Sequence, residues 1–345
     1  MKISDYFISP EHPPFIIAEV AQSHEGSLGM ALSFIEVAAE CGVHAIKFQT
    51  HLAEEESTPR EPWRIPFSPQ DASRYDYWQR LAFTLEQWAL LKAHAERLGL
   101  VFLSSPFSLK ACDWLESLGM VAWKLASGEV RNPQIVRRVQ GTGKPLLLSS
   151  GLSTPGEILT LAHQLTEAGS KVAVFHCTSQ YPTSPEQVGL NLLSDFLQAE
   201  PQLPVGLSDH SASPVPGIVA TYLGASLIEV HLTLHPRSFG PDVTSSLTPE
   251  GLKALVAGVN FAWRMRQAPV DKAHQLQTLG FDPAIFGRSW VTTRALEQGT
   301  ILRQEDVAYK KPAGGLSHDA LEPLLGRRLN RSVLIHHVIG VNDVD

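Results

Sequence analysis

Eight short apolar runs that alternate with longer segments of helical period are the feature that most constrains the fold of this chain. The runs are rich in β-branched and large apolar residues, as buried parallel strands are. Strands that alternate with helices predict repeated βα units around a parallel sheet. The eight expected strands span residues 15–20, 44–48, 100–104, 121–126, 145–149, 172–177, 204–207 and 226–232.

The number and length of these units favour a closed barrel over an open doubly wound sheet. Eight units fit into about 265 residues, close to the roughly 250 residues of a typical (β/α)8 barrel. A G-x-G-x-x-G motif does not follow the first expected strand, which argues against a dinucleotide-binding sheet. Hydroxyl residues followed by Pro and an acid open the expected helices 154–168 and 249–267. We therefore predict an α/β fold, a TIM barrel over residues 1–267.

Two segments depart from this repeat. An insertion over residues 53–80, rich in Pro, Glu, Arg and aromatic residues, follows the second expected strand, where barrel loops build sites. Residues 268–283 are predicted to be a polar linker, and residues 284–345 a small β-rich domain with one short helix over 318–325. A domain of roughly 60 residues has a marginal core, so we expect it to pack on the barrel or on a partner chain.

Charge and cysteine content exclude several classes of protein. With 28 Lys and Arg against 35 Asp and Glu, the net charge is -7, so the chain has no global basic field to recruit nucleic acid or a membrane. The three cysteines form no C-x-x-C pair, which argues against disulfides and a thiolate metal site. The sequence shows neither a signal peptide nor an apolar run long enough to span a bilayer, so a cytoplasmic protein is expected.

Polar side chains occur at the end of every expected strand. In a TIM barrel the chemistry lies at these carboxyl ends. Residues two apart along a strand share a face, as Lys47 and Gln49 do, so such pairs point to the same side. The strand-end residues are Glu19, Lys47, Gln49, Ser104, Ser105, Lys124, Ser127, Glu129, Ser149, Ser150, His176, Ser179, Tyr181, Ser208, Asp209, His210, Glu229 and His231.

Lys47 and Lys124 would both point into the barrel mouth and therefore indicate an anionic ligand. Lysine binds phosphate or carboxylate as a compact charge, and the serines at neighbouring strand ends supply hydroxyl donors. The alternative is that each lysine pairs with a neighbouring acid such as Glu19 or Glu129. Pairing with acids alone explains two such lysines less well than it explains one.

His210 and His231 end consecutive strands, so their imidazoles can converge on one metal ion. Asp209, Glu229 or water would complete its coordination shell. Oxygen-rich surroundings without thiolate favour Mn²⁺, Mg²⁺ or a similar divalent ion such as Co²⁺ over structural zinc. Most of the 14 histidines are expected to be surface or satisfied core residues, and the paired strand-end position distinguishes these two.

The motifs at these strand ends resemble those of the sialic acid synthase family, the N-acetylneuraminate and related nonulosonate synthases. The resemblance covers nearly the whole chain. The tail, with G-T-I-L at 299–302 and K-P-A-G-G-L at 311–316, is similar to the antifreeze-like (SAF) domain that ends those enzymes. The barrel motifs are I-A-E-V (17–20), H-E-G-S (24–27), A-I-K-F-Q-T (45–50), F-L-S-S-P-F (102–107), K-L-A-S-G-E (124–129), H-C-T-S-Q-Y-P (176–182), G-L-S-D-H-S (206–211) and I-E-V-H (228–231).

The resemblance implies condensation of phosphoenolpyruvate with an open-chain N-acyl hexosamine, typically N-acetylmannosamine, to give a nine-carbon 2-keto acid and phosphate. His210 and His231 would hold a divalent ion, Mn²⁺ in the family, that polarises the sugar aldehyde as a Lewis acid. Glu19 would transfer a proton or activate the water. The residues implied to hold phosphoenolpyruvate are Lys47, Ser105, Lys124, Ser127, Ser179, Ser208 and His210.

The resemblance also implies a sugar side of the site. Its residues would be Gln49, Glu129, Tyr181 and Asp242, joined by Lys311 of the SAF domain in a domain-swapped homodimer. Lys311 stands where an arginine is usual in the family. Departures from the family pattern cluster on this side, at 23–26 and 243–244 and in the insertion, although Ser105 and Ser179 also replace commoner residues.

These departures leave the acceptor sugar open. An N,N'-diacetylated hexose leading to legionaminic or pseudaminic acid is one alternative, and a sugar phosphate held by Arg60, Arg64 or Arg74 is another. Rival activities are a Schiff-base aldolase that uses Lys47 or Lys124, and a metal-dependent hydrolase. A rival from another class is an inactive sugar-binding protein, although such a protein has no need of an ion beside two lysines.

Overall fold

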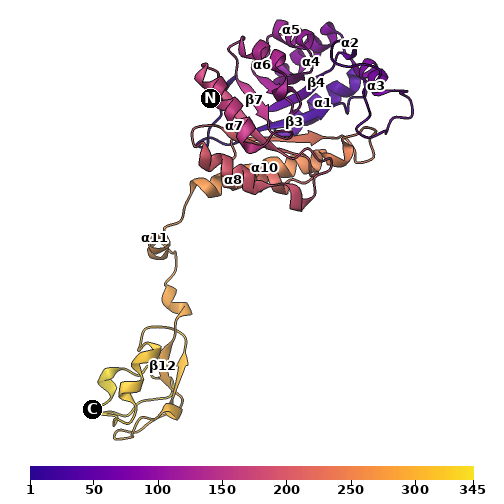
Figure 1. The fold of residues 1–345 in the computed structure, drawn as a ribbon. Coiled ribbons are helices and arrows are strands. Elements are labelled where there is room, and N and C mark those ends of the chain that lie inside the picture. Colours follow the sequence, from indigo (N-terminus) through magenta and orange to yellow (C-terminus); the bar gives the residue numbers. More distant parts are fainter. The chain divides into compact units, whose positions relative to one another are not determined.

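The computed structural model describes residues 1–345 apart from the side chain of Pro283. The chain forms two compact units, Met1–Ala268 and Pro269–Asp345. Figure 1 shows the strands and helices of the first unit, which carries the predicted site residues other than Lys311. None of the helices in the described residues is long and apolar enough to cross a membrane.

Eight parallel strands form the centre of the first unit. The ladder runs β5-β4-β3-β10-β9-β8-β7-β6 with every neighbouring pair parallel. The end strands β5 and β6 also contact each other, so the sheet is a nearly closed barrel and the predicted TIM barrel is confirmed. The strands are β3 (Phe15–Ala21), β4 (Ala45–Thr50), β5 (Val101–Pro106), β6 (Trp123–Leu125), β7 (Leu146–Ser149), β8 (Val172–Cys177), β9 (Val205–Asp209) and β10 (Leu227–Leu232).

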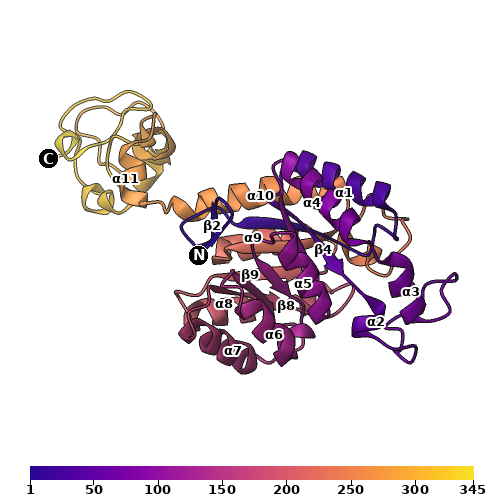
Figure 2. The same cartoon turned by 90° about the horizontal axis from the view of Figure 1, so that it is seen from above.

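Helices between the strands cover the outside of the barrel (Figure 2). Capping boxes begin two of them, at Thr84 and at Thr154, where the hydroxyl accepts a backbone N–H and an acid or amide three residues later bonds back. Gly206 allows β9 to lie against β10, because a Cβ there would be 2.7 Å from the carbonyl oxygen of Leu227. The helices are α1 (Leu28–Cys41), α4 (Leu85–Arg97), α5 (Leu109–Ser117), α6 (Pro133–Gln140), α7 (Pro155–Glu167), α8 (Leu190–Ala199), α9 (Val215–Leu223) and α10 (Pro249–Gln267).

Short elements lie at both ends of the barrel. The hairpin β1 (Lys2–Ile3) and β2 (Tyr6–Phe7) packs Tyr6 against Phe15 and His44, where β3 and β4 begin, and so lies at the amino-terminal end. At the carboxyl end, β11 (Ser246–Leu247) pairs with the last residues of β10. The three cysteines are free and buried, in line with the expected absence of disulfides.

The insertion after β4 folds into two short helices and an aromatic cluster. The helices are α2 (Ala53–Glu56) and α3 (Arg74–Leu81). Arg80 fixes the end of α3, because its guanidinium binds both Asp71 and Glu25. The cluster buries Tyr77, Trp78 and Leu81 against Trp63, Phe67 and Tyr75. The insertion is therefore packed as a small wall beside the carboxyl ends of the strands.

The second unit contains α11 (Lys272–Gln277) and one antiparallel pair, β12 (Ser289–Thr292) with β13 (Val307–Lys310). Its small core is built around Trp290, Leu302 and Ile339. The α-helix expected over 318–325 is wrong: that segment forms two 3-10 turns, His318–Ala320 and Glu322–Leu324. Pro323 lacks the N–H that an α-helix starting at His318 would need there. The assignment of this unit as a SAF domain stays a prediction.

Candidate active site

A small polar cavity of about 60 Å³ lies at the carboxyl ends of the strands. Strand register builds one layer of it, because Glu19 on β3 is the partner of both Lys47 on β4 and His231 on β10. We call it the inner cavity. Its lining residues are Glu19, Lys47, Gln49, Ser105, Lys124, Ala126, Ser127, Ser149, Cys177, Tyr181, Ser208, His210, Glu229 and His231.

Two lysines and two glutamates form a buried charge cluster in this cavity. Lys47 Nζ lies 2.7 Å from Glu19 Oε2 and 3.6 Å from Glu229 Oε1, and Lys124 Nζ lies 3.1 Å from Glu229 Oε1. All four side chains are at most 5% exposed. The sequence left open whether the lysines pair with acids, and both do, Lys124 with Glu229 rather than Glu129.

Burial and charge act against each other in this cluster. Burial disfavours the ammonium of Lys47, but Glu19 and Glu229 outweigh it and raise the pKa of Lys47. At Lys124 burial prevails and lowers the pKa. Burial acts to raise the pKa of Glu229, yet Lys124 and Lys47 together hold it below its usual range. Glu229 is therefore the carboxylate that bridges the two lysines.

Two of the predicted serines contact this cluster, whereas Ser127 lines both cavities and Ser179 lines only the larger one described below. Ser105 Oγ accepts from Lys47 Nζ at 3.4 Å, and Ser208 Oγ donates to Glu229 at 3.3 Å. Ser127 and Ser179 face each other across Gly151, where a Cβ would come within 2.7 Å of Ser127 Oγ and would also overlap Ser179 Oγ. The absence of a side chain at Gly151 therefore makes room for these two hydroxyls.

His210 and His231 lie next to each other, with ring centroids 5.2 Å apart. The His210 Nδ1–H donates to the carbonyl oxygen of Thr178 at 2.9 Å, which leaves the Nε2 lone pair available. Burial lowers the pKa of His210 to about 3, so the ring is neutral. Nδ1 of His231 is buried and has no hydrogen-bond partner among the described residues. The Tyr181 ring packs 4.0 Å from the His210 ring, centroid to centroid.

The acids expected to complete a metal shell are engaged elsewhere. Glu229 binds the two lysines, and Asp209 accepts hydrogen bonds from the Oγ and N–H of Ser211. In the part of the chain that the structure describes, His, Cys, Asp and Glu do not gather in threes around a possible ion. A metal held here would thus have two protein ligands, His210 and His231.

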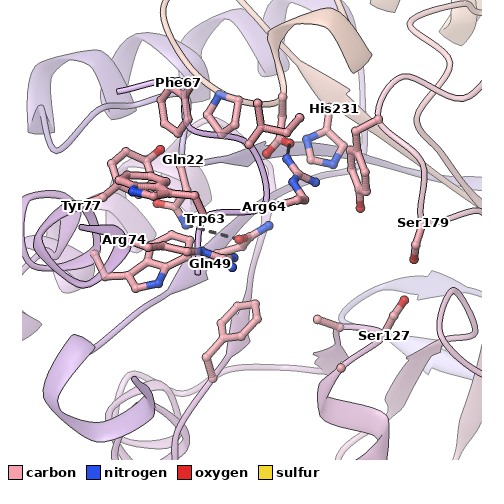
Figure 3. A pocket seen from close by; sticks show the side chains of 18 of the residues that line it. Gln22, Gln49, Trp63, Arg64, Phe67, Arg74, Tyr77, Ser127, Ser179 and His231 are labelled. Carbon is pink, nitrogen blue, oxygen red and sulfur yellow. Dashed lines mark hydrogen bonds and ion pairs between the residues drawn. The ribbon is translucent and has the colours of Figure 1, made fainter. Parts of the chain in front are cut away.

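A second cavity of about 250 Å³, which we call the outer pocket, is walled by the insertion (Figure 3). Aromatic and apolar side chains, among them Trp63, Phe67 and Tyr77, form much of its lining. Its two arginines are each paired with an acid: Arg64 Nη2 lies 2.5 Å from Asp242, and Arg74 Nη1 lies 3.1 Å from Glu61. The two cavities share Gln49, Ala126, Ser127, Tyr181 and His231.

The residues predicted to face the sugar divide into two groups. Gln49, Tyr181 and Asp242 line the outer pocket. Glu129 lies after β6, bound by the amide of Asn132 at 3.1 Å, and is outside the described lining of both cavities. Lys311 is an exposed residue of the second unit, with its ammonium 5.4 Å from the centre of the Phe286 ring. Its contact with a sugar, like that of Glu129, stays a prediction.

Sequence reasoning missed several residues of the site. The sequence predicts Glu229 only as a metal ligand, although its place two residues before His231 already puts it on the inward face. Gln22 lies outside the predicted site residues, and its amide nitrogen donates to Gln49 Oε1 at 3.3 Å. Arg64 was expected only as a residue that could hold a sugar phosphate. Its guanidinium stacks over Tyr181, 4.3 Å from the ring centre, and nothing in the sequence of the insertion signals that contact.

The barrel, the buried charge cluster and the paired imidazoles define a TIM-barrel protein with a site of the enzyme type, at the carboxyl ends of the strands. The model of the NeuB family matches residues 34–270. The chain belongs to this family, the family of sialic acid synthases.

Named relatives span nearly the whole chain. An N,N'-diacetyllegionaminic acid synthase of Campylobacter jejuni is 31% identical over 90% of this chain and 94% of its own length. A human N-acetylneuraminate-9-phosphate synthase is 28% identical over 94% of this chain and 90% of its own length. The crystal structure of an N-acetylneuraminic acid synthetase from Leptospira borgpetersenii has a TM-score of 0.67 and 25% identity, covering 77% of this chain and 90% of that one.

Proposed function

We propose that the protein is a nonulosonic acid synthase that condenses phosphoenolpyruvate with an open-chain N-acyl hexosamine to give a nine-carbon 2-keto acid and phosphate. The observation that carries this proposal is the inner cavity, where two buried lysines lie beside paired imidazoles in a chain of the NeuB family. Relatives named as synthases of legionaminic and neuraminic acids support it.

The inner cavity suits phosphoenolpyruvate. Lys47 and Lys124 supply positive charge for its phosphate and carboxylate, and their dehydration is already complete in the folded protein. The hydroxyls implied to donate to its oxygens are those of Ser105, Ser127, Ser179 and Ser208, with His210 beside them.

His210 and His231 fit a divalent metal ion. Both rings are buried. In the described residues Nδ1 of His231 has no hydrogen-bond partner and the lone pair of His210 is free, so each ring can donate an electron pair to a metal ion. We propose Mn²⁺, with Mg²⁺ or Co²⁺ as alternatives, its remaining ligands coming from water or substrate. When bound, the ion would polarise the sugar aldehyde as a Lewis acid.

The protein's own residues then stabilise the developing charge and transfer protons. Carbon 3 of phosphoenolpyruvate forms a bond to the aldehyde carbon with the electrons of its double bond to carbon 2, and the aldehyde oxygen takes up a proton from solvent water. Positive charge develops at carbon 2, next to the carboxylates of Glu19 and Glu229, which stabilise it. Water adds to carbon 2 and gives a proton to Glu19, which later releases it to solvent. The bond from carbon 2 to the phosphate oxygen then breaks, the proton of the new hydroxyl leaves with the phosphate, and carbon 2 becomes the ketone. Gln49 and Lys47 orient the Glu19 carboxylate for this role, at 2.8 and 2.7 Å.

The outer pocket favours an uncharged acceptor. Its arginines are already neutralised by Asp242 and Glu61, so a sugar phosphate would have to displace an acid from Arg64 or Arg74. Its aromatic wall suits the apolar faces of an acylated sugar. We therefore propose N-acetylmannosamine or a diacetylated hexose leading to legionaminic or pseudaminic acid, ahead of a sugar phosphate.

Phosphate release from phosphoenolpyruvate tests this proposal. The assay takes Mn²⁺ and a panel of N-acetylmannosamine, its 6-phosphate and diacetylated hexoses, with and without EDTA. We expect release with an uncharged sugar that EDTA stops and added Mn²⁺ restores. Folded protein that releases no phosphate with any of these sugars would contradict the proposal.

One observation favours a second candidate activity. Burial lowers the pKa of Lys124, as it does for lysines that form imines with keto acids. Borohydride trapping with pyruvate, followed by mass spectrometry, tests this Schiff-base activity. We expect no adduct, because Glu229 holds the Lys124 ammonium at 3.1 Å.

We also propose that the second unit is a SAF domain and that the protein works as a domain-swapped homodimer, with Lys311 of one chain reaching the sugar of the other. The unit's small core supports a role that depends on packing against another surface. Sedimentation at micromolar concentration tests this, and a fully active monomer would contradict it.

A further inference from the structure

Gln49 is joined to a buried pair of side chains that the proposed reaction does not use. His51 follows β4 directly, and Glu56 is the last residue of α2. The His51 side chain is 6% exposed and that of Glu56 is 8% exposed. Nδ1 of His51 hydrogen-bonds Oε1 of Glu56, and the other Glu56 oxygen accepts from the N–H of Leu52 at 3.2 Å. Both groups are thus held at the edge of the outer pocket.

Aromatic stacking fixes the plane of the His51 ring. Its centroid lies 3.9 Å from the Trp78 ring and 4.1 Å from the Phe107 ring, with interplanar angles of 11° and 19°. A ring held on both faces can turn only within its plane, and the bond to Glu56 prevents that. The Nε2 edge therefore points in one direction, to Gln49 Oε1 at 3.1 Å.

The directions of the hydrogen bonds that link Glu19, Gln49 and His51 are set by Glu19, at one end of the series. The Glu19 carboxylate accepts, so the amide nitrogen of Gln49 faces it at 2.8 Å. The amide oxygen of Gln49 then faces His51 Nε2 and the amide nitrogen of Gln22. His51 Nε2 must therefore carry a hydrogen, whichever of Nδ1 and Glu56 holds the proton between them.

We propose that His51, oriented by Glu56, is a positioning residue that fixes the amide of Gln49 and, through it, the carboxylate of Glu19. This inference rests on the proposed function, in which Gln49 faces the sugar and Glu19 handles protons. Without the His51 donor the Gln49 amide can rotate, and a rotated amide turns an acceptor toward Glu19. Both the binding site of the acceptor sugar and the orientation of the Glu19 carboxylate would then be disordered, where the two cavities meet at Gln49.

Three substitutions separate positioning from structural support. His51→Phe keeps a flat ring between Trp78 and Phe107 but removes the donor. Glu56→Met removes the oxygens that orient His51. Glu55→Met is the matched control, because Glu55 lies on the same helix and pairs with Lys110 at 3.0 Å on the surface.

We expect His51→Phe to lower kcat/KM for the acceptor sugar about tenfold and Glu56→Met about fivefold, the loss of one hydrogen bond to a reactive group. The KM for phosphoenolpyruvate should stay within about twofold, because Lys47 and Lys124 are untouched. Glu55→Met should match the wild type. Should His51→Phe fail to fold, Glu56→Met carries the kinetic test. Variants that match the control, or that weaken both substrates equally, overturn the inference.

A second measurement needs no turnover. In protein labelled with ¹⁵N at histidine, the His51 signals, identified by their loss in His51→Phe, should show Nε2 protonated in the wild type and altered in Glu56→Met. An unprotonated Nε2 overturns the inference. A wild type with no activity on any acceptor would instead overturn the proposed function, and the nitrogen signals would still decide the role of His51.

Discussion

Replacing Glu229 by Gln tests whether one carboxylate holds the charge cluster together. The amide keeps the size of the side chain and its contact with Ser208 but removes the negative charge between two lysines. Lys47 retains Glu19 at 2.7 Å, whereas Lys124 keeps the Ser149 hydroxyl, also at 2.7 Å, and the face of the Phe175 ring at 4.7 Å. The variant therefore leaves a buried ammonium without a counter-ion.

The size of the loss in stability expected for Glu229→Gln follows from the geometry. Charges 3.1 Å apart attract by about 5 kcal/mol at an effective dielectric constant of about 20. Because the variant no longer buries a carboxylate, the net loss is smaller, and breaking buried pairs typically costs about 3–5 kcal/mol. For a domain of this size that corresponds to a fall in Tm of about 6–20 °C.

The loss of stability in Glu229→Gln depends on pH in a defined direction. Burial already lowers the pKa of Lys124, and without Glu229 the pKa falls further. Between the lowered pKa of the folded variant and the unfolded lysine pKa of about 10.4, the unfolded chain binds up to one more proton, so stability rises with pH by up to about 1.4 kcal/mol per unit. The variant should therefore be closest to the wild type at alkaline pH and furthest from it near neutrality.

Thermal and urea unfolding at pH 7 and pH 9 measure both effects. Glu116→Gln is the control, since it breaks a partly exposed pair with Lys144 at 2.8 Å and should cost no more than about 1 kcal/mol. A Glu229→Gln protein that unfolds like this control, with no dependence on pH, would refute the reasoning.

Three further substitutions probe the rest of the site. His231→Ala should abolish metal-dependent phosphate release while circular dichroism shows an intact fold; wild-type activity would remove His231 from the metal site. Gly151→Ala should raise the KM for phosphoenolpyruvate about tenfold or more, because its Cβ displaces the hydroxyls of Ser127 and Ser179; an unchanged KM would separate these serines from that substrate. Arg64→Met should raise the KM for the sugar about fivefold by releasing Asp242, with no change for phosphoenolpyruvate, and equal shifts for both substrates would argue against an acceptor role.

The sequence predicted the barrel well because buried parallel strands leave a strong apolar signal. The strand at 172–177 has the predicted limits. Four strands run further than predicted at their carboxyl ends, β3 to Ala21, β4 to Thr50, β5 to Pro106 and β9 to Asp209. These extra residues are mostly polar, so an apolar pattern cannot include them, although the parallel ladder continues through Gln49 and Ser105.

Periodicity predicted the site only on strands or directly after them, whereas Tyr181 and Asp242, which lie in loops after β8 and β10, were implied only by the family resemblance. Period-two alternation placed Lys47, His210 and His231 on inward faces without any knowledge of loops. The contacts of Arg64 and His51 depend instead on the path of the insertion, in which packing of Trp78 and its neighbours decides which side chains reach the pocket. Such loop packing has no short-range sequence signal.

The cost of the buried charge cluster is itself an argument about function. Desolvation of each of the four charged groups costs several kcal/mol, and well-packed apolar residues would be as stable or more stable in their place. The residues two positions earlier on the same strand faces are apolar, such as Ile17 before Glu19 and Leu227 before Glu229, so the charges occur where the strands line the inner cavity. There an anionic substrate can replace a carboxylate as the partner of a lysine whose dehydration was completed when the chain folded. Binding then forms strong ionic contacts without dehydrating the lysines again, which is what preorganisation of an anion site requires.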